Sequence, residues 1–249
     1  MAKSTTTPTP TYSTAGTVSA PIDLSGLKGE YTALDLQGAG TSKGKKVVKP
    51  GVKVTLTSLT VNNSGTLRRI NSVVIPIVYS DKFYKEVRDP SLDDVNKLIY
   101  YADIPVGAIC CRFDNLAKGS KEPPTLVILT LAILAPYRSL NLGTSLLLAS
   151  MKSSLHPTIP PPPVPSDTRT NTRGSLTVAP PRVKVNRALA HVQVGNEDAK
   201  RFYERLGFKE AGIEENYYSK VEPRGAVIMV CEDIAAALGE GGDEVNGSA

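Results

Sequence analysis

The sequence predicts an α/β fold, a mixed and mostly antiparallel central sheet flanked by about four helices. Apolar runs of strand length alternate with longer amphipathic runs over residues 51–233, a pattern typical of a sheet covered by helices. In residues 125–151, TLVILTLAILAPYRSLNLGTSLLLASM, an apolar strand leads through a short turn into a Leu-rich helix. With 249 residues and 41% hydrophobic content, the chain is long enough to bury one substantial core.

Helix caps and breakers set several element boundaries. Asn63 or Ser64 can cap a first helix, which Pro76 ends. Ser80 and Asn196 can cap two later helices. The elements predicted in order are a strand at residues 52–59, helices at 64–75 and 81–87, strands at 97–102, 106–113 and 126–134, a helix from 142, a strand at 188–194, a helix at 197–206, and strands near 208–218 and 226–231.

Composition divides the chain into a folded part with two polar ends. Residues 1–50 are rich in Thr, Ser, Gly, Pro and Lys, and we expect a disordered extension. Residues 51–233 carry the strand and helix patterns, and residues 234–249 predict an acidic, disordered tail. Residues 156–187 are rich in proline, which cannot donate to a strand ladder or continue a helix, so they predict a mobile, polyproline-like insertion. A spacer is the first interpretation of this insertion, and a ligand for an SH3 or WW module is the alternative.

Charge is unevenly distributed along the chain, whose net charge is +5. Residues 1–53 hold seven Lys against three acidic residues, and residues 156–187 hold five Lys and Arg against one Asp. Residues 232–249 hold five acidic residues and no basic one. Basic charge in loops and extensions is typical of a peripheral contact with an acidic surface such as ribosomal RNA, although merely solvated segments would have the same composition.

Neither a membrane protein nor a secreted disulfide protein is predicted. The sequence has no run of about 18 apolar residues, and its first residues contain no apolar signal core. The three cysteines, Cys110, Cys111 and Cys231, lie in apolar runs and do not form a zinc or disulfide framework. We therefore expect reduced, buried cysteines and a protein of the cytoplasm, with the nucleus as a second compartment.

The turn between the strand at residues 126–134 and the helix that opens at Leu142 is a candidate phosphate site. A helix N-terminus presents unpaired backbone amides and the positive end of the helix dipole, and both attract phosphate. The turn, Arg138-Ser-Leu-Asn-Leu-Gly143, resembles the acetyl-CoA-binding signature of the GNAT acetyltransferases, Gln/Arg-x-x-Gly-x-Gly/Ala. One glycine of that signature is Asn141 here.

Further motifs carry a more specific resemblance. They are IPIVYSDKFYKEV (75–87), ICCRFD (109–114), LAPYR (134–138), HVQVGN (191–196), FYERLGF (202–208) and NYYSKVEP (216–223). In this order they resemble the San family, the catalytic subunits of the NatE N-terminal acetyltransferases. The resemblance implies the GNAT fold and transfer of acetyl from the co-substrate acetyl-CoA, without a metal, to the α-amine of nascent peptides that begin with Met and an apolar residue. It also implies docking on the TPR-type auxiliary subunit and the catalytic subunit of NatA at the ribosome.

The same resemblance implies a set of cofactor contacts. Backbone amides around Leu131 and Ile133 would polarise the thioester carbonyl, a contribution that needs no particular side chain. Tyr203 would lie near the sulfur and protonate the departing thiolate, although a packed helix aromatic is the alternative. The implied acetyl-CoA-binding residues are Leu131, Ala132, Ile133, Arg138, Ser139, Leu140, Asn141, Leu142, Gly143, Thr144, Asn196 and Tyr203.

His191 is the candidate general base. A peptide α-amine has a pKa of about 7.7 to 8.0, so a base, or a water held by a base, has only one modest proton to remove. Imidazole has a suitable pKa, and His191 matches the base position of the family. The only other histidine, His156, lies in the predicted insertion. A strand histidine with a purely structural role is the alternative.

Apolar and tyrosine side chains on two loops are the candidate peptide site. An apolar slot suits an initiator Met, and tyrosine hydroxyls can bond the peptide backbone, although ordinary loop packing is the alternative. The implied substrate-binding residues are Ile75, Pro76, Ile77, Tyr79, Arg112, Leu129, Tyr217 and Tyr218.

Two positions depart from the family pattern. The family has a Tyr in the central strand as a second water-holding group, and the matching residue is Val127, whose side chain neither donates nor accepts. Asn141 tolerates left-handed backbone angles, but its side chain occupies space where a phosphate oxygen approaches the main chain. Both departures predict reduced activity. The alternatives to an active enzyme on peptide α-amines are a weakly active or inactive CoA-binding subunit that stabilises the NatA and NatE assembly, and a GNAT enzyme acting on lysine side chains or small amines.

Overall fold

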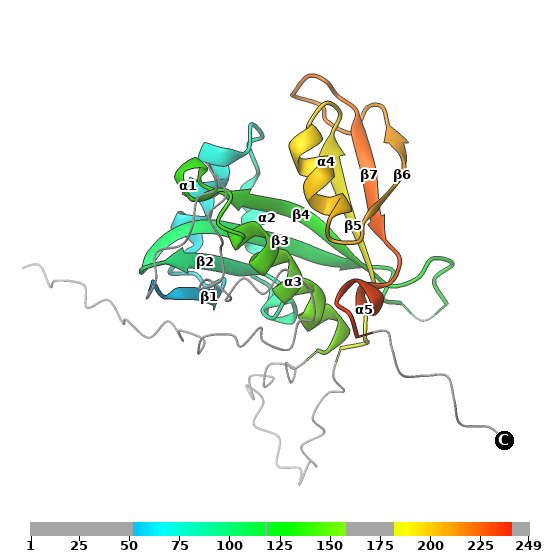
Figure 1. The fold of residues 1–249 in the computed structure, drawn as a ribbon, viewed down its shortest axis with the longest axis horizontal. Helices are drawn as coiled ribbons and strands as arrows, with labels where there is room; N and C mark the ends of the chain where they lie inside the picture. The colour runs from blue at the N-terminus through cyan, green and yellow to red at the C-terminus, as the bar shows by residue number, and fades with distance from the viewer. Residues whose placement is uncertain (1–51, 118, 158–181, 241–249) are drawn as a thin grey trace, which may run out of the picture.

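A computed structural model describes residues 52–117, 119–157 and 182–240. Seven strands form one sheet in the order β1-β2-β3-β4-β5-β7-β6, and every neighbouring pair is antiparallel except β4 and β5. Helices lie against this sheet (Figure 1), so the predicted α/β class with a mixed, mostly antiparallel sheet is confirmed. The strands are β1 Val54–Ser58, β2 Lys97–Tyr101, β3 Ile104–Asp114, β4 Thr125–Ile133, β5 Arg187–Gln193, β6 Lys209–Glu214 and β7 Ala226–Cys231. The helices are α1 Ser64–Val74, α2 Asp81–Glu86, α3 Leu142–Leu155, α4 Glu197–Glu204 and α5 Ile234–Ala237, with short 3-10 turns η1 Pro90–Leu92 and η2 Ala135–Tyr137.

Two apolar layers hold the helices against the sheet. Helices α3, α4 and α5 share one layer, in which Leu146, Tyr203 and Ile234 are buried together with strand residues. Helices α1 and α2 share the second, smaller layer, which contains Leu67 and Tyr84. The sheet thus separates the two loops that carry the candidate peptide residues from most of the helix that opens the candidate phosphate site.

Helix α3 is the central helix, and it is buried on almost all sides, with serine and threonine side chains among its buried residues. Its polar side chains are satisfied by backbone carbonyls: the Ser150 hydroxyl donates to Val95 at 2.6 Å, and the Ser154 hydroxyl donates to Met151 at 2.7 Å. Neither α3 nor any other helix of the described residues has the length and apolarity needed to cross a membrane.

Strand β4 leaves its neighbour β5 partway along its length. Only Thr125–Ile128 pair with β5, in parallel register, and the ladder stops there. The register between β3 and β4 shifts at the same point, which makes Leu129 an extra residue in β4. A bulge of this kind bends a strand and increases its twist. The carboxyl half of β4 therefore diverges from β5 (Figure 1), and backbone groups on that edge are left without a strand partner.

The structure places one end of the predicted proline-rich insertion in the core. The prediction of a mobile segment over residues 156–187 is wrong at its carboxyl end, where Val185 is fully buried. Arg182 forms an ion pair with Asp94, and β5 already begins at Arg187. The composition of the whole segment could not predict these contacts. The burial of Val185 and the ion pair of Arg182 depend on residues that are far away in the sequence.

The predicted acidic tail also begins too early. Helix α5 occupies Ile234–Ala237, the side chain of Asp233 accepts a hydrogen bond from the N–H of Ala236 at 2.9 Å, and Ile234 is fully buried. A short apolar run behind a capping aspartate explains this helix, and the acidic composition of the surrounding residues concealed it. The predicted extension over residues 1–50, the middle of the insertion at 158–181 and the end of the tail at 241–249 lie outside the described residues.

Candidate functional site

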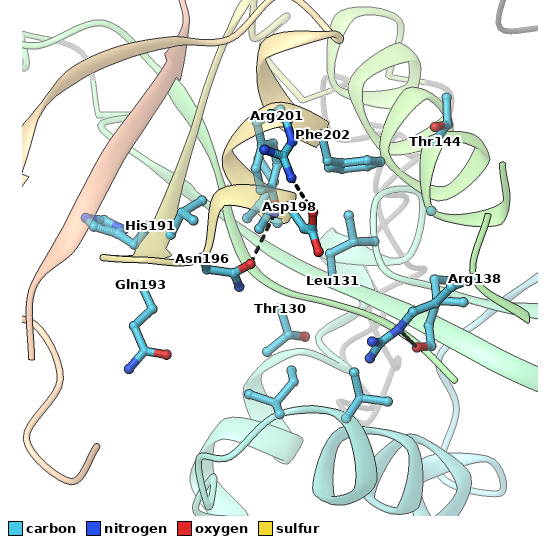
Figure 2. A pocket seen from close by; sticks show the side chains of 18 of the residues that line it. Thr130, Leu131, Arg138, Thr144, His191, Gln193, Asn196, Asp198, Arg201 and Phe202 are labelled. Atoms are coloured by element: carbon cyan, nitrogen blue, oxygen red, sulfur yellow. Dashed lines mark hydrogen bonds and ion pairs between the residues drawn. The ribbon is translucent and has the colours of Figure 1, made fainter. Parts of the chain in front are cut away.

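A cleft of about 1000 Å³ opens where β4 and β5 diverge. The loop between α1 and α2 lines one end, and the turn that leads into α3 lines the other. Residues of helix α4 form another wall of the cleft. Figure 2 shows Leu131 of β4 between the side chains of α4, such as Phe202, and the turn that carries Arg138. The cleft is therefore continuous from the candidate peptide residues to the candidate phosphate site.

Two backbone amides of β4 face the gap that β5 leaves. The N–H of Leu134 donates to the carbonyl of Val106 on β3 at 2.9 Å. Because successive residues of a strand point their backbone groups to opposite edges, the N–H groups of Leu131 and Ile133 face away from β3. The side chain of Arg138 donates to the carbonyl of Ile133 at 3.1 Å from that same open edge. The bulged strand thus offers two N–H groups to an oxygen atom in the cleft.

The turn into α3 is shaped to expose the first amides of that helix. Ser139 and Asn141 adopt left-handed backbone angles, with φ of 65° and 59°. Asn141 occupies the N-cap position, but its side chain makes no capping hydrogen bond, and the first turn contains no acidic side chain. The first helical N–H groups have no intrahelical partner. They therefore form an anion site with no carboxylate in the turn to oppose a phosphate.

Helix α4 brings a capping asparagine and a buried phenol to the cleft. The side chain of Asn196 accepts from the N–H of Ala199 at 3.2 Å and begins the helix, as predicted. Tyr203 packs edge-to-face against Phe202 and Phe208, with ring centroids 5.2 and 5.1 Å apart. Burial raises the pKa of the Tyr203 phenol well above its ordinary value. The phenol therefore keeps its proton and is available as a hydrogen-bond donor.

His191 lies on β5, and an aromatic ring covers its imidazole. The ring of Tyr217 stacks on the imidazole with centroids 4.1 Å apart and planes 12° apart. The phenol of Tyr218 donates to the backbone carbonyl of His191 at 3.4 Å. Burial lowers the pKa of His191 below its ordinary value, an effect that Glu214 opposes and Arg112 reinforces. The imidazole is consequently neutral near pH 7, as a general base must be.

Tyrosines also form the wall at the peptide end of the cleft. Tyr79 stacks on Phe83 with ring centroids 4.3 Å apart, and burial raises its phenol pKa, with smaller contributions from Tyr218 and Tyr217. Burial likewise raises the pKa of Tyr218 to about 12. Both phenols are therefore neutral: that of Tyr79 is able to donate to a peptide carbonyl, and that of Tyr218, whose proton points to the carbonyl of His191, is able to accept from a peptide N–H.

Comparisons with known proteins identify the family. The chain is 33% identical over 177 residues to N-alpha-acetyltransferase 50 of Danio rerio, covering 71% of this chain and 87% of that protein. The chain belongs to the N-alpha-acetyltransferase 50/San family. It is also 32% identical to the probable N-acetyltransferase san of Drosophila melanogaster, over 71% of this chain and 79% of that protein. No family model matches the sequence.

A solved structure of the same family agrees with the fold. Arabidopsis thaliana Naa50, in complex with the bisubstrate analogue CoA-Ac-MVNAL, has a TM-score of 0.55 and 30% identity, over 71% of this chain and 97% of that one. Membership of the N-alpha-acetyltransferase 50/San family and the GNAT fold are thus confirmed, and the chain is an acetyltransferase.

The structure brings most of the residues that the family resemblance implied into one cleft. Those that line it are Ile75, Pro76, Ile77, Tyr79, Leu129, Leu131, Ile133, Arg138, Ser139, Asn141, Gly143, Thr144, His191, Asn196, Tyr203 and Tyr218. Five others are placed differently. Ala132, Leu140 and Leu142 are buried in the two apolar layers. Arg112 forms a hydrogen-bonded ion pair with Asp114 at 2.8 Å, and Tyr217 covers His191 from outside.

Sequence analysis missed part of the α4 wall. Asp198, Arg201 and Arg205 line the cleft, and Arg201 pairs with Asp198 at 2.5 Å. Their spacing of three and four residues places them on one side of a helix, a signal that could have found them once Asn196 was taken as the cap. The other lining residues that were missed are Val74, Ile128, Thr130, Tyr137, Val192, Gln193, Ala199, Phe202 and Glu204.

Val127, which replaces the tyrosine of the family pattern, lies outside the cleft. Val127 is 5% exposed, pairs with Leu189 in the short parallel ladder and is not among the residues that line the cleft.

Within residues 52–117, 119–157 and 182–240, no group of three or more His, Cys, Asp or Glu side chains is placed to hold a metal ion.

Proposed function

We propose that this enzyme transfers acetyl from acetyl-CoA to the α-amine of peptides that begin with Met followed by an apolar residue. The observation that carries the proposal is the continuous cleft, which joins an apolar and tyrosine-lined entrance to a helix N-terminus suited to phosphate. The Arabidopsis thaliana relative, solved with an analogue that joins CoA to a peptide beginning with Met and Val, supports the same arrangement of two substrates.

The residues present fit acetyl-CoA. The amides at the start of α3 would hold the pyrophosphate, with Arg138 beside them, and Asn196 and Tyr203 would contact the pantetheine arm. The N–H groups of Leu131 and Ile133 would donate to the thioester carbonyl and stabilise the negative charge that develops on its oxygen. Tyr203 would donate its phenolic proton to the departing sulfur.

His191 would take the proton that the amine loses. An α-ammonium group must be deprotonated before its nitrogen attacks the thioester, and the lowered pKa of His191 keeps the imidazole in the basic form at neutral pH. Holding the two reactants against one strand replaces a bimolecular encounter with a positioned one. Tyr79 and Tyr218 would bond the peptide backbone, and the apolar side chains of Ile75 and Ile77 would surround the Met side chain.

Incubation of the purified protein with acetyl-CoA and a peptide beginning Met-Leu tests this function. Mass spectrometry is expected to show one added acetyl group on the peptide N-terminus. The control is a peptide that also begins Met-Leu, has an already acetylated N-terminus and contains an internal lysine. Acetylation of the control at comparable rate would instead identify a lysine acetyltransferase.

A second candidate function is a CoA-binding subunit with little turnover, and two observations favour it. Val127 cannot hold a water, and Asn141 presents a side chain at the phosphate turn. On this proposal the protein mainly stabilises an assembly with the TPR-type auxiliary subunit and the catalytic subunit of NatA, at the ribosome in the cytoplasm and also in the nucleus. Absence of product at high enzyme concentration, with CoA binding intact, would favour this function.

Replacing Asn141 with glycine is expected to tighten acetyl-CoA binding by up to about tenfold, or ~1.4 kcal/mol. Glycine adopts the observed φ of 59° without strain, and its lack of a side chain opens the amides of α3 to a phosphate oxygen. The added freedom of the unbound turn opposes this gain by up to ~1 kcal/mol. Isothermal titration calorimetry measures the result, and weaker binding by the variant would mean that the asparagine side chain itself contacts the cofactor.

A further inference from the structure

The carboxylate of Glu214 lies beside His191. Glu214 is the last residue of β6, and its Oε2 is 3.7 Å from the Nε2 of His191. The His191 side chain is 17% exposed and the Glu214 side chain 53%. The distance is that of an ion pair and is slightly long for a hydrogen bond, as is common for catalytic contacts before substrate binds.

The register of the sheet explains how these side chains meet across the intervening strand. His191 on β5 pairs with Ile228 on β7, and Ile228 pairs with Gly212 on β6. Side chains two residues apart on a strand share a face, so Glu214 lies on the same face as the glycine. Because position 212 has no side chain, nothing there blocks the reach of Glu214 over β7 towards the imidazole.

The imidazole has two different nitrogen environments. Its Nε2 faces the carboxylate, whereas its Nδ1 is shielded from solvent and has no hydrogen-bond partner among the described residues. A carboxylate stabilises a proton on the nitrogen beside it, so this geometry favours the neutral tautomer with its proton on Nε2 and its lone pair on Nδ1. The stacked ring of Tyr217 holds the plane of the imidazole.

We propose that Glu214 is a positioning residue of this active site: its carboxylate faces the Nε2–H of His191, fixes the tautomer of the neutral ring and stabilises the imidazolium that forms when the ring takes up a proton. The proposal rests on the role of His191 as the base. The other groups that face the ring are Arg112 from β3, which is already paired with Asp114, and the phenols of Tyr217 and Tyr218.

The proton balance of acetyl transfer shows at which stage Glu214 would act on His191. An α-ammonium group carries three protons on nitrogen and the amide product carries one. One of the two lost protons restores the phenol of Tyr203, which has given its own proton to the CoA sulfur. The other is held by His191 as the imidazolium, paired with Glu214, and leaves to solvent after the acetylated peptide departs. The half-exposed carboxylate stabilises that charged intermediate form of the ring and connects it to water.

Imidazole NMR tests the contact without depending on catalysis. The chain has only two histidines, so a long-range ¹H–¹⁵N spectrum contains two sets of ring signals, and His156, which pairs with Glu240, is an internal reference. The wild-type protein is expected to show the Nε2–H form of His191. Glu214→Gln is expected to lower the pKa of His191, because the charge that stabilises the imidazolium is lost, and to leave His156 unchanged. An unchanged His191 pKa would overturn the proposal.

Kinetics test the consequence for the reaction. Glu214→Gln is expected to move the acidic limb of the pH profile of kcat/KM to lower pH, because the active neutral imidazole persists further. Glu214→Ala, which also removes the acceptor for Nε2–H, is expected to lower kcat by about tenfold, a loss typical of the partners that orient catalytic ligands. Glu214→Asp should restore part of the wild-type profile.

Glu215→Gln is the matched control, because it removes the same charge from the next residue, which is exposed. This control is expected to leave both the His191 signals and the pH profile unchanged. An equal shift in Glu215→Gln would indicate a general field effect and overturn the specific contact. Full activity of a His191→Ala variant would overturn the proposed base and this proposal with it, even if the NMR contact remained.

Discussion

Replacing His191 with alanine is expected to lower kcat by about 10²- to 10⁴-fold, the range that general-base assistance usually supplies. Binding of acetyl-CoA is expected to stay within about twofold of wild type, because the phosphate turn at residues 138–144 lies at the other end of the cleft. Single-turnover kinetics with a peptide beginning Met-Leu measures the first quantity, and calorimetry measures the second.

The size of this effect follows from the environment of the ring. Burial lowers the pKa of His191, so the neutral imidazole is already the dominant form at pH 7 and the ring needs no further deprotonation. An alanine at this position leaves Tyr217 without its stacking partner, but no other described residue places an imidazole in the cleft. The wild-type acidic limb of kcat/KM should therefore lie below the ordinary imidazole pKa of about 6.5.

His156→Ala is the control for this variant. His156, which was predicted to begin the mobile insertion, is the C-cap residue of α3, and its Nε2 is 2.5 Å from a carboxylate oxygen of Glu240. The cleft does not include it, so we expect kcat to be unchanged. A His191→Ala enzyme with wild-type kcat would contradict the base assignment and would leave catalysis to positioning by the amides of Leu131 and Ile133.

Local signals in the sequence predicted those parts of the fold that depend on neighbouring residues. Ser80 and Asn196 accept hydrogen bonds from the N–H groups of Phe83 and Ala199, as the capping patterns indicated. The left-handed angles of Asn141 were likewise predictable, because asparagine tolerates them at a turn. The turn into α3 could also be placed from the sequence, because an apolar strand run and a Leu-rich helix run lie on either side of it.

Features that depend on pairing between distant residues were not predictable. The bulge at Leu129 exists only relative to the register of β3, and this bulge is what separates β4 from β5 and opens the cleft. Glu214 meets His191 across a third strand, which no spacing in the sequence encodes. Val185 became part of the core through contacts with distant elements, so proline content alone misplaced the boundary of the insertion.

Replacing Arg182 with methionine is expected to lower the free energy of unfolding by about 3–5 kcal/mol, the loss typical when one partner of a buried ion pair is removed. The two terminal guanidinium nitrogens of Arg182, Nη1 and Nη2, each donate to an oxygen of Asp94 at 2.7 Å, and the two side chains are 14% and 4% exposed. The same guanidinium lies over the ring of Phe113, 4.1 Å from its centroid. Methionine keeps much of the apolar volume but leaves the Asp94 carboxylate buried without its cation.

Urea denaturation measures this loss, and Arg224→Met is the matched control. Arg224 pairs with Glu222 at 2.8 Å, but these side chains are 56% and 74% exposed, so the control should cost less than about 1 kcal/mol. Adding Asp94→Asn to Arg182→Met removes the unpaired charge and should recover part of the stability. A double variant no more stable than the single one would mean that Arg182 stabilises the fold through its other contacts, which are its packing on Phe113 and its hydrogen bonds to the carbonyls of Ser91 and Ser153. In either case, a loss in Arg182→Met well above that of Arg224→Met would establish that this end of the proline-rich segment belongs to the folded core.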